Sequence, residues 1–73
     1  MRYYLVKIAY NKSSGAEDRP GPAAYDSFDD ANKAFHSFMY QSIKGSTIGW
    51  ALGIIIDDLG NVHKVEKWTA PEE

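Results

Sequence analysis

The stretch Ile48-Gly-Trp-Ala-Leu-Gly-Ile-Ile-Ile-Asp57, followed at once by Asp58-Leu59-Gly60, decides the fold of this 73-residue chain. Its apolar and β-branched residues predict a strand over residues 48–57. Asp57 to Gly60 predicts a hairpin built on a type I turn, with Gly60 in the left-handed region, and a second strand over residues 61–69. Because both faces of 48–57 are apolar, we expect this strand at the centre of the sheet.

A helix is predicted upstream of this hairpin, over residues 27–44. Ser27 is a suitable N-cap, and Asp30, three residues later, can complete a capping box. Lys44 and Gly45 form a typical helix end, a cation in the last turn followed by a capping glycine. The apolar positions fall on one helical face: Phe28, Ala31, Ala34, Phe35, Phe38 and Met39.

The remaining segments complete the layout. Residues 2–10 are rich in strand-forming side chains, residues 11–26 read as a long loop that contains Pro20-Gly21-Pro22, and residues 70–73 read as a frayed tail. The expected fold is therefore α+β, a single β-α-β-β domain over residues 1–73 with a three-stranded sheet and one helix packed on one face.

Two strand orders fit this layout. In the favoured order, 48–57 lies in the centre and 2–10 runs parallel to it through a right-handed crossover. The charges of 61–69 suit an edge strand and support this order. The alternative is an antiparallel sheet with 61–69 in the centre.

Alternation of strand residues divides the two apolar strands into two faces. The Leu5 face consists of Tyr3, Leu5, Lys7, Ala9, Ala51, Gly53, Ile55 and Asp57. The Trp50 face consists of Tyr4, Val6, Ile8, Tyr10, Trp50, Leu52, Ile54 and Ile56. Because the Trp50 face is larger and more apolar, we expect the helix to cover it.

The pairing of the hairpin determines where the side chains of 61–69 lie. If Ile56 lies opposite Val62, regular pairing places Trp68 opposite Trp50. Lys64 and Glu66 then fall on the covered face, which requires either an edge position or a bulge that shifts the register.

One helix leaves one side of the sheet uncovered, and we expect that side to be the Leu5 face. Regular pairing also places His63, Val65 and Lys67 of the last strand on the Leu5 face. An open surface that is half apolar and half basic commonly marks an interaction site. The candidate interaction face consists of Tyr3, Leu5, Lys7, Ile55, His63, Val65 and Lys67.

Composition limits the chemistry of the chain. It has no cysteine and two histidines, so neither a disulfide nor a structural zinc site is expected. The net charge of −2 is not the basic excess of a dedicated DNA-binding protein. The longest apolar run is too short to span a membrane and no signal peptide is recognisable, so we expect a cytoplasmic protein without a membrane partner.

Four residues are candidates for catalysis or metal binding. Asp57 and Asp58 could hold a hard cation, but aspartate is also a turn former at the start of a hairpin, which is the favoured interpretation. His36 is interpreted as an exposed helical histidine and His63 as a solvated strand histidine. No catalytic, cofactor or metal residues are therefore predicted, and no small-molecule substrate is identified.

The leading hypothesis is a non-enzymatic protein-interaction module that forms a homodimer or binds another protein. The alternative is binding of single-stranded nucleic acid through Tyr3, Lys7, His63 and Lys67. Sheet-type RNA readers stack bases on two or three aromatic side chains, whereas the candidate face offers one.

Three stretches together resemble short uncharacterised proteins of bacterial phage and prophage genomes. They are Tyr3-Tyr4-Leu5-Val6-Lys7-Ile8 leading to Asn11-Lys12, the segment Phe28 to Phe38, and Gly49-Trp50-Ala51-Leu52 followed by Gly60-Asn61-Val62-His63-Lys64. The resemblance brings no catalytic residues. It implies an accessory role, in which a small protein binds and inhibits a host or phage component.

Overall fold

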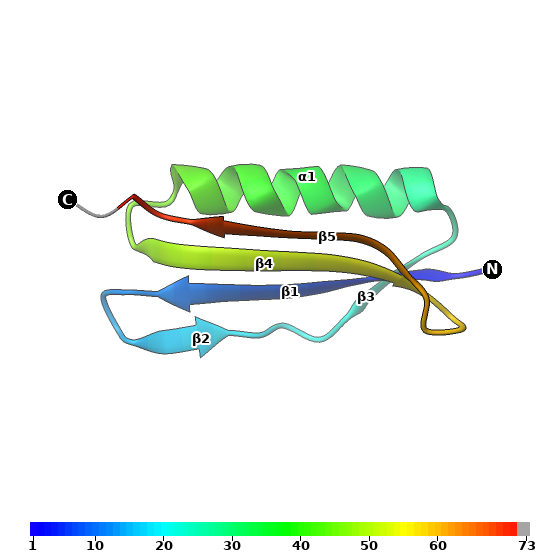
Figure 1. Cartoon of the computed structure of the whole chain (residues 1–73), viewed down its shortest axis with the longest axis horizontal. Coiled ribbons are helices and arrows are strands. Elements are labelled where there is room, and N and C mark those ends of the chain that lie inside the picture. The colour runs from blue at the N-terminus through cyan, green and yellow to red at the C-terminus, as the bar shows by residue number, and fades with distance from the viewer. Residues whose placement is uncertain (72–73) are drawn as a thin grey trace.

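The computed structural model describes residues 1–71; the predicted tail at residues 72–73 lies outside the described residues. Its elements are β1 (Tyr3–Asn11), β2 (Ala16–Asp18), β3 (Ala23–Tyr25), α1 (Phe28–Lys44), β4 (Ile48–Asp57) and β5 (Val62–Thr69). The single helix runs along the length of the sheet (Figure 1). The α+β class with one helix is confirmed, but the sheet has five strands rather than three.

The two additional strands lie in the segment that was predicted to be loop 11–26. Asn11 begins a tight turn, in which Gly15 adopts a φ of 73° and donates its backbone N–H to Asn11 O at 2.8 Å. The chain then returns along β1, so that β2 pairs with its end and β3 with its beginning. The loop prediction was wrong for these residues because β1 supplies their backbone partners, which local sequence does not reveal.

The sheet order is β2-β1-β4-β5, with β3 also paired to β1. This places β4 between β1 and β5, as the favoured strand order requires. The predicted parallel crossover was wrong, however, because β1 and β4 are antiparallel. β2 and β3 carry the chain back to the start of β1 before α1 begins, so α1 runs in the direction of β1 and β4 returns.

The ends of α1 follow the capping residues. The Ser27 side chain accepts a hydrogen bond from the Asp30 N–H at 3.2 Å. At the other end, the Gly45 N–H donates to the carbonyls of Gln41 and Ser42. Ala31, Phe35 and Met39 are buried and form the side of the helix that packs against the sheet.

The helix packs on the Leu5 face, which corrects the predicted assignment of the two faces. Leu5 and Ile55 are fully buried in one cluster with Phe35. The reason is steric: a Cβ on Gly53 would lie 2.8 Å from the Phe35 ring, so only a residue without a side chain admits the ring at this distance. Small residues, rather than the largest apolar ones, bring the helix close to the sheet.

A bulge shifts the pairing of β5. Ile56 lies opposite Val62 as predicted, but the register changes between Ile55 and Ile56, so Trp50 pairs with Thr69 rather than Trp68. Val65 and Lys67 therefore lie beside the Trp50 face, while Lys64 and Glu66 lie on the helix side.

The candidate interaction face is therefore divided between the two sides of the sheet. Tyr3, Leu5, Lys7, Ile55 and His63 lie on the helix side, and Val65 and Lys67 lie on the open side. Leu5 and Ile55 are fully buried there, which corrects their predicted exposure, whereas Tyr3 and Lys7 are half-buried and His63 is exposed. No helix within residues 1–71 is long and apolar enough to cross a membrane.

Candidate interaction site

The Trp50 face is the uncovered side of the sheet. α1 lies on the opposite side, and residues 1–71 place no second layer over this one. Its side chains form four cross-strand rows from β1 through β4 to β5, fixed by the strand register. The rows are Tyr10–Trp50–Thr69, Ile8–Leu52–Lys67, Val6–Ile54–Val65 and Tyr4–Ile56–Val62.

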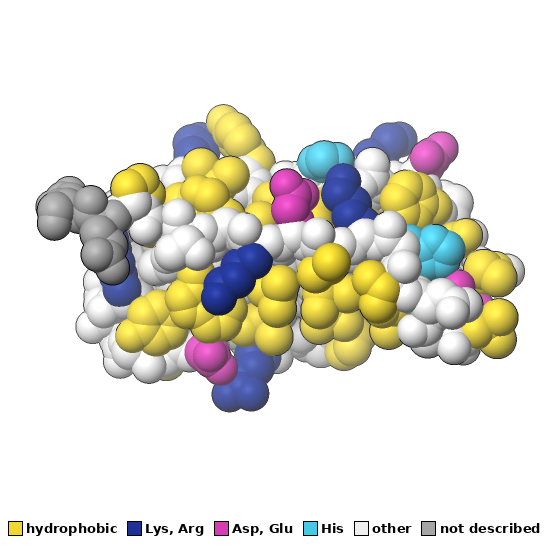
Figure 2. Space-filling view, in the orientation of Figure 1, with side chains coloured by type: hydrophobic (Ala, Val, Ile, Leu, Met, Phe, Trp, Pro, Cys, Tyr) yellow, Lys and Arg dark blue, Asp and Glu magenta, His cyan; other side chains and the backbone are white. Residues whose placement is uncertain are grey.

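These rows form an apolar surface with little charge. The members on β1 and β4 are half-buried by their neighbours on the same face, whereas Val62 and Val65 on β5 are 60% and 59% exposed. Lys67 is the one charged residue in the four rows. Figure 2 shows hydrophobic side chains in a band along the strands, interrupted by a few charged ones. A continuous apolar patch on a small protein indicates a contact surface.

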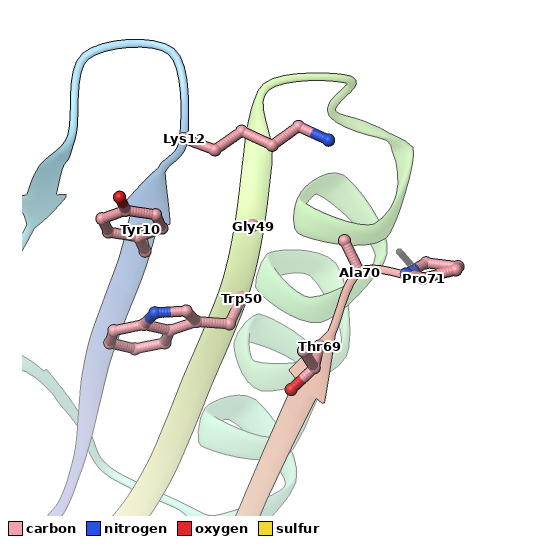
Figure 3. A pocket seen from close by; sticks show the side chains of 7 residues that line it. All are labelled: Tyr10, Lys12, Gly49, Trp50, Thr69, Ala70 and Pro71. Atoms are coloured by element: carbon pink, nitrogen blue, oxygen red, sulfur yellow. The ribbon is translucent and has the colours of Figure 1, made fainter. Parts of the chain in front are cut away.

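An aromatic pair closes one end of the Trp50 face. The rings of Tyr10 and Trp50 are parallel within 5°, with centroids 6.0 Å apart, and Lys67 Nζ lies 4.9 Å from the Trp50 ring centroid. Beside them is an open cavity of 570 Å³ (Figure 3). Its lining consists of Tyr10, Lys12, Gly49, Trp50, Thr69, Ala70 and Pro71.

Gly49 determines how closely these aromatic side chains approach the backbone. A Cβ at this position would lie 2.9 Å from the Tyr10 ring. Without it, the edge of the Tyr10 ring can lie close to the β4 backbone. Figure 3 shows the Trp50 ring extending from β4 toward β1, beside Tyr10. The result is a stacked pair of aromatic rings with a cation over the Trp50 ring.

His63 and Tyr3 belong to a different cluster, at the hairpin end of the sheet. The His63 ring lies edge-on to Tyr3, with centroids 5.2 Å apart, and Phe28 at the start of α1 lies close to both. His63 Nε2 is 2.9 Å from Asp57 Oδ2. His63 lies on the Leu5 side, where regular pairing also places it, and α1 packs on that side of the sheet. Its side chain remains exposed beside Phe28.

Asp57 holds the turn between β4 and β5. Its Oδ1 accepts the backbone N–H groups of Leu59 and Asn61, both at 2.9 Å, and its Oδ2 accepts from the Asn61 side chain at 3.2 Å. The hydrogen bond from His63, followed by that from the Asn61 backbone, holds the pKa of this carboxyl well below its usual range. Gly60 completes the turn with a φ of 87°, as predicted.

The contacts of Asp57 give this side chain a structural role in the turn. Both carboxylate oxygens are already occupied by donors within the turn. His63 lines neither the Trp50 cavity nor the groove between α1 and β5. Among residues 1–71, no three His, Cys, Asp or Glu side chains are grouped to hold a metal ion.

A groove between α1 and β5 is another concave feature. It has a volume of 350 Å³ and is lined by His36, Met39, Tyr40, Ile43, Glu66, Lys67 and Trp68. His36 is exposed, with its Nε2 3.2 Å from Lys64 Nζ, and the same ammonium donates to Asn32 Oδ1 at 3.0 Å. Lys64 therefore fastens β5 to the helix.

The sequence signal that identifies the open face is the size of its residues. Ala9, Ala51 and Gly53 leave room on the Leu5 face for a closely packed helix, and the Trp50 face has no comparable gap along its centre.

Comparison with family models, curated proteins and solved structures finds no match for this chain. The candidate site is therefore defined by the geometry of the Trp50 face.

Proposed function

We propose that this chain is a non-enzymatic protein-interaction module that self-associates through the Trp50 face. The observation that carries the proposal is the row of large apolar side chains that β1 and β4 present on this face without a covering layer. A largely apolar face is compatible with a copy of itself, because Lys67 is the one charge in its four rows that must be accommodated. Two copies packed face to face would form a two-layer sheet with both helices outside.

The size of the face fits a weak contact. Three strands about 4.8 Å apart, over about eight residues of about 3.3 Å each, give a projected area of roughly 380 Å². Two copies would bury about 760 Å² in total, which lies in the range of weak, transient interfaces. We therefore expect a reversible dimer with a dissociation constant in the micromolar range or weaker.

Light scattering after size-exclusion chromatography tests self-association over a wide range of concentration. The wild-type mass should rise from one chain toward two. Leu52→Glu, which places a carboxylate in the centre of the face, should weaken this association at least tenfold. Ser37→Glu adds the same charge on the exposed side of α1 and should behave as wild type. A monomer at every concentration, or equal association of Leu52→Glu, would overturn the proposal.

A second candidate function is binding of single-stranded nucleic acid through the same face. Three aromatic side chains, Tyr4, Tyr10 and Trp50, lie on this face, and Lys67 adjoins the Trp50 ring. Stacking platforms for single strands combine aromatic rings with cations in this way. The expected behaviour is binding to an oligonucleotide that weakens with salt and is further weakened by Lys67→Glu. Absence of binding at low salt would eliminate this function.

An accessory role of the phage type, with binding to a host or phage component, belongs to the same proposal. So does a cytoplasmic location. Both rest on the sequence resemblance. A partner identified in infected or lysogenic cells should bind wild type and lose its affinity for Leu52→Glu.

A further inference from the structure

β5 is an edge strand with backbone groups available for pairing. Ala70 N–H donates to Gly49 O at 2.8 Å, and the register places Trp68, Glu66 and Lys64 in the same alternating set of bonds to β4. The N–H and C=O groups of Val65, Lys67 and Thr69 therefore point outward. In the described part of the chain, no strand pairs with this edge.

The outward groups restrict how a second copy can pair with this edge. In an antiparallel contact between β5 and β5′ of a second copy, residues whose backbone groups point outward must lie opposite each other. These are alternate residues, so the two-fold axis that relates the copies passes through a residue and not between two residues. We call the residue on the axis the centre of the register, and centres at residues 64 to 67 keep most of the strand paired. Each of these centres sets different side chains opposite each other across the new ladder.

Charge selects one of the four centres. A centre at Lys64, Glu66 or Lys67 sets that residue opposite its own copy, and like charges directly opposite are destabilising. A centre at Val65 sets Lys64 opposite Glu66′ and Glu66 opposite Lys64′, while Val65 meets Val65′. Only this register joins unlike charges and covers the exposed Val65 side chain.

We propose that β5 pairs with β5′ of a second copy in the register centred on Val65. The charges on β5 then have two effects: they oppose the other registers, as charged edge strands commonly do, and they favour this one. The bulge at the beginning of β5 keeps the ladder short, so the contact should be weak and reversible. Edge pairing leaves the β1 and β4 side chains of the Trp50 face uncovered and goes beyond the proposed function, so the two contacts can coexist.

Disulfide trapping tests the register directly, because the chain contains no cysteine. In a hydrogen-bonded antiparallel pair the Cα atoms are about 5.5 Å apart, which a disulfide can span. Val65→Cys should form covalent dimers under mild oxidation. The matched control is Lys67→Cys on the same strand and face, where two copies of residue 67 would be about 13 Å apart, too far for a disulfide. Both variants carry Leu52→Glu, which removes association through the Trp50 face.

A charge exchange supplies the second readout. Glu66→Lys should reduce the yield of Val65→Cys dimers several-fold, because it sets two lysines opposite each other. Adding Lys64→Glu to that variant should restore the yield. Equal trapping of the two cysteine variants, no trapping of either, or a yield unaffected by Glu66→Lys would each overturn the edge-pairing proposal. Because Leu52→Glu is present throughout, these outcomes leave the test of the Trp50 face separate.

Discussion

Gly53 sets the separation between α1 and the sheet. The Phe35 ring fills the space above it and is fully buried. Gly53→Ala should destabilise the protein by about 1–3 kcal/mol, the usual cost of overpacking a core. Urea unfolding measures this change, with Gly21→Ala as the control, because a Cβ there meets nothing within 4 Å. Equal stability of the two variants would show that the ring does not lie against the glycine.

Asp57 makes stability depend on acid pH. Its pKa in the folded chain lies below the ordinary value of 3.8, chiefly because of the His63 hydrogen bond, so the unfolded state takes up the proton first. The stabilisation is complete above about pH 4 and is lost as the pH falls toward the folded-state pKa.

Urea midpoints measured from neutral pH to about pH 2 should therefore fall more steeply for wild type than for Asp57→Asn. The amide that this substitution introduces can still accept a turn hydrogen bond but carries no charge to lose. Asp58→Asn, at the exposed neighbouring position, should keep the wild-type dependence. If the urea midpoint of wild type depended on pH as little as that of Asp57→Asn, the Asp57 carboxylate would make no electrostatic contribution to stability, which would contradict this prediction.

At the scale of elements, α1 depends on its first turn. The Ser27 side chain satisfies the Asp30 N–H. Ser27→Ala should cost about 1 kcal/mol, the typical effect of losing an N-cap. Ser37→Ala, at an exposed site within the same helix, should be neutral or slightly stabilising because alanine is the better helix former. Thermal unfolding followed by circular dichroism distinguishes the two, and equal midpoints would contradict the cap.

The elements differ in how far sequence could predict them. α1 and the β4–β5 hairpin carry their own signals in Ser27, in Gly45 and in the Asp57–Gly60 turn. β2 and β3 do not, because three-residue strands depend on pairing with β1 rather than on a pattern of their own. Those two short strands also return the chain to the start of β1 before α1 begins, so that β4 runs antiparallel to β1. A predicted fold that lacks β2 and β3 therefore favours a parallel crossover from β1 to β4.

At the scale of the whole molecule, the choice of the covered face was the main error. Hydrophobicity favoured covering the Trp50 face, whereas close approach of the helix requires the small residues Ala51 and Gly53 on the Leu5 face. Val65 and Lys67 nevertheless lie on the open side, because the bulge in β5 moves them across the sheet. Sequence thus indicated that one face would be open, and side-chain volume decided which one.

Thiol labelling of single-cysteine variants tests this arrangement and the proposed contact together. Ile54 lies on the Trp50 face and Ile55 is fully buried beneath α1. In dilute native protein, Ile54→Cys should react rapidly and Ile55→Cys should be protected to the level set by unfolding. Raising the concentration should protect Ile54→Cys as copies cover the face, without changing Ile55→Cys. Rapid labelling of Ile55→Cys with protection of Ile54→Cys at every concentration would contradict the account.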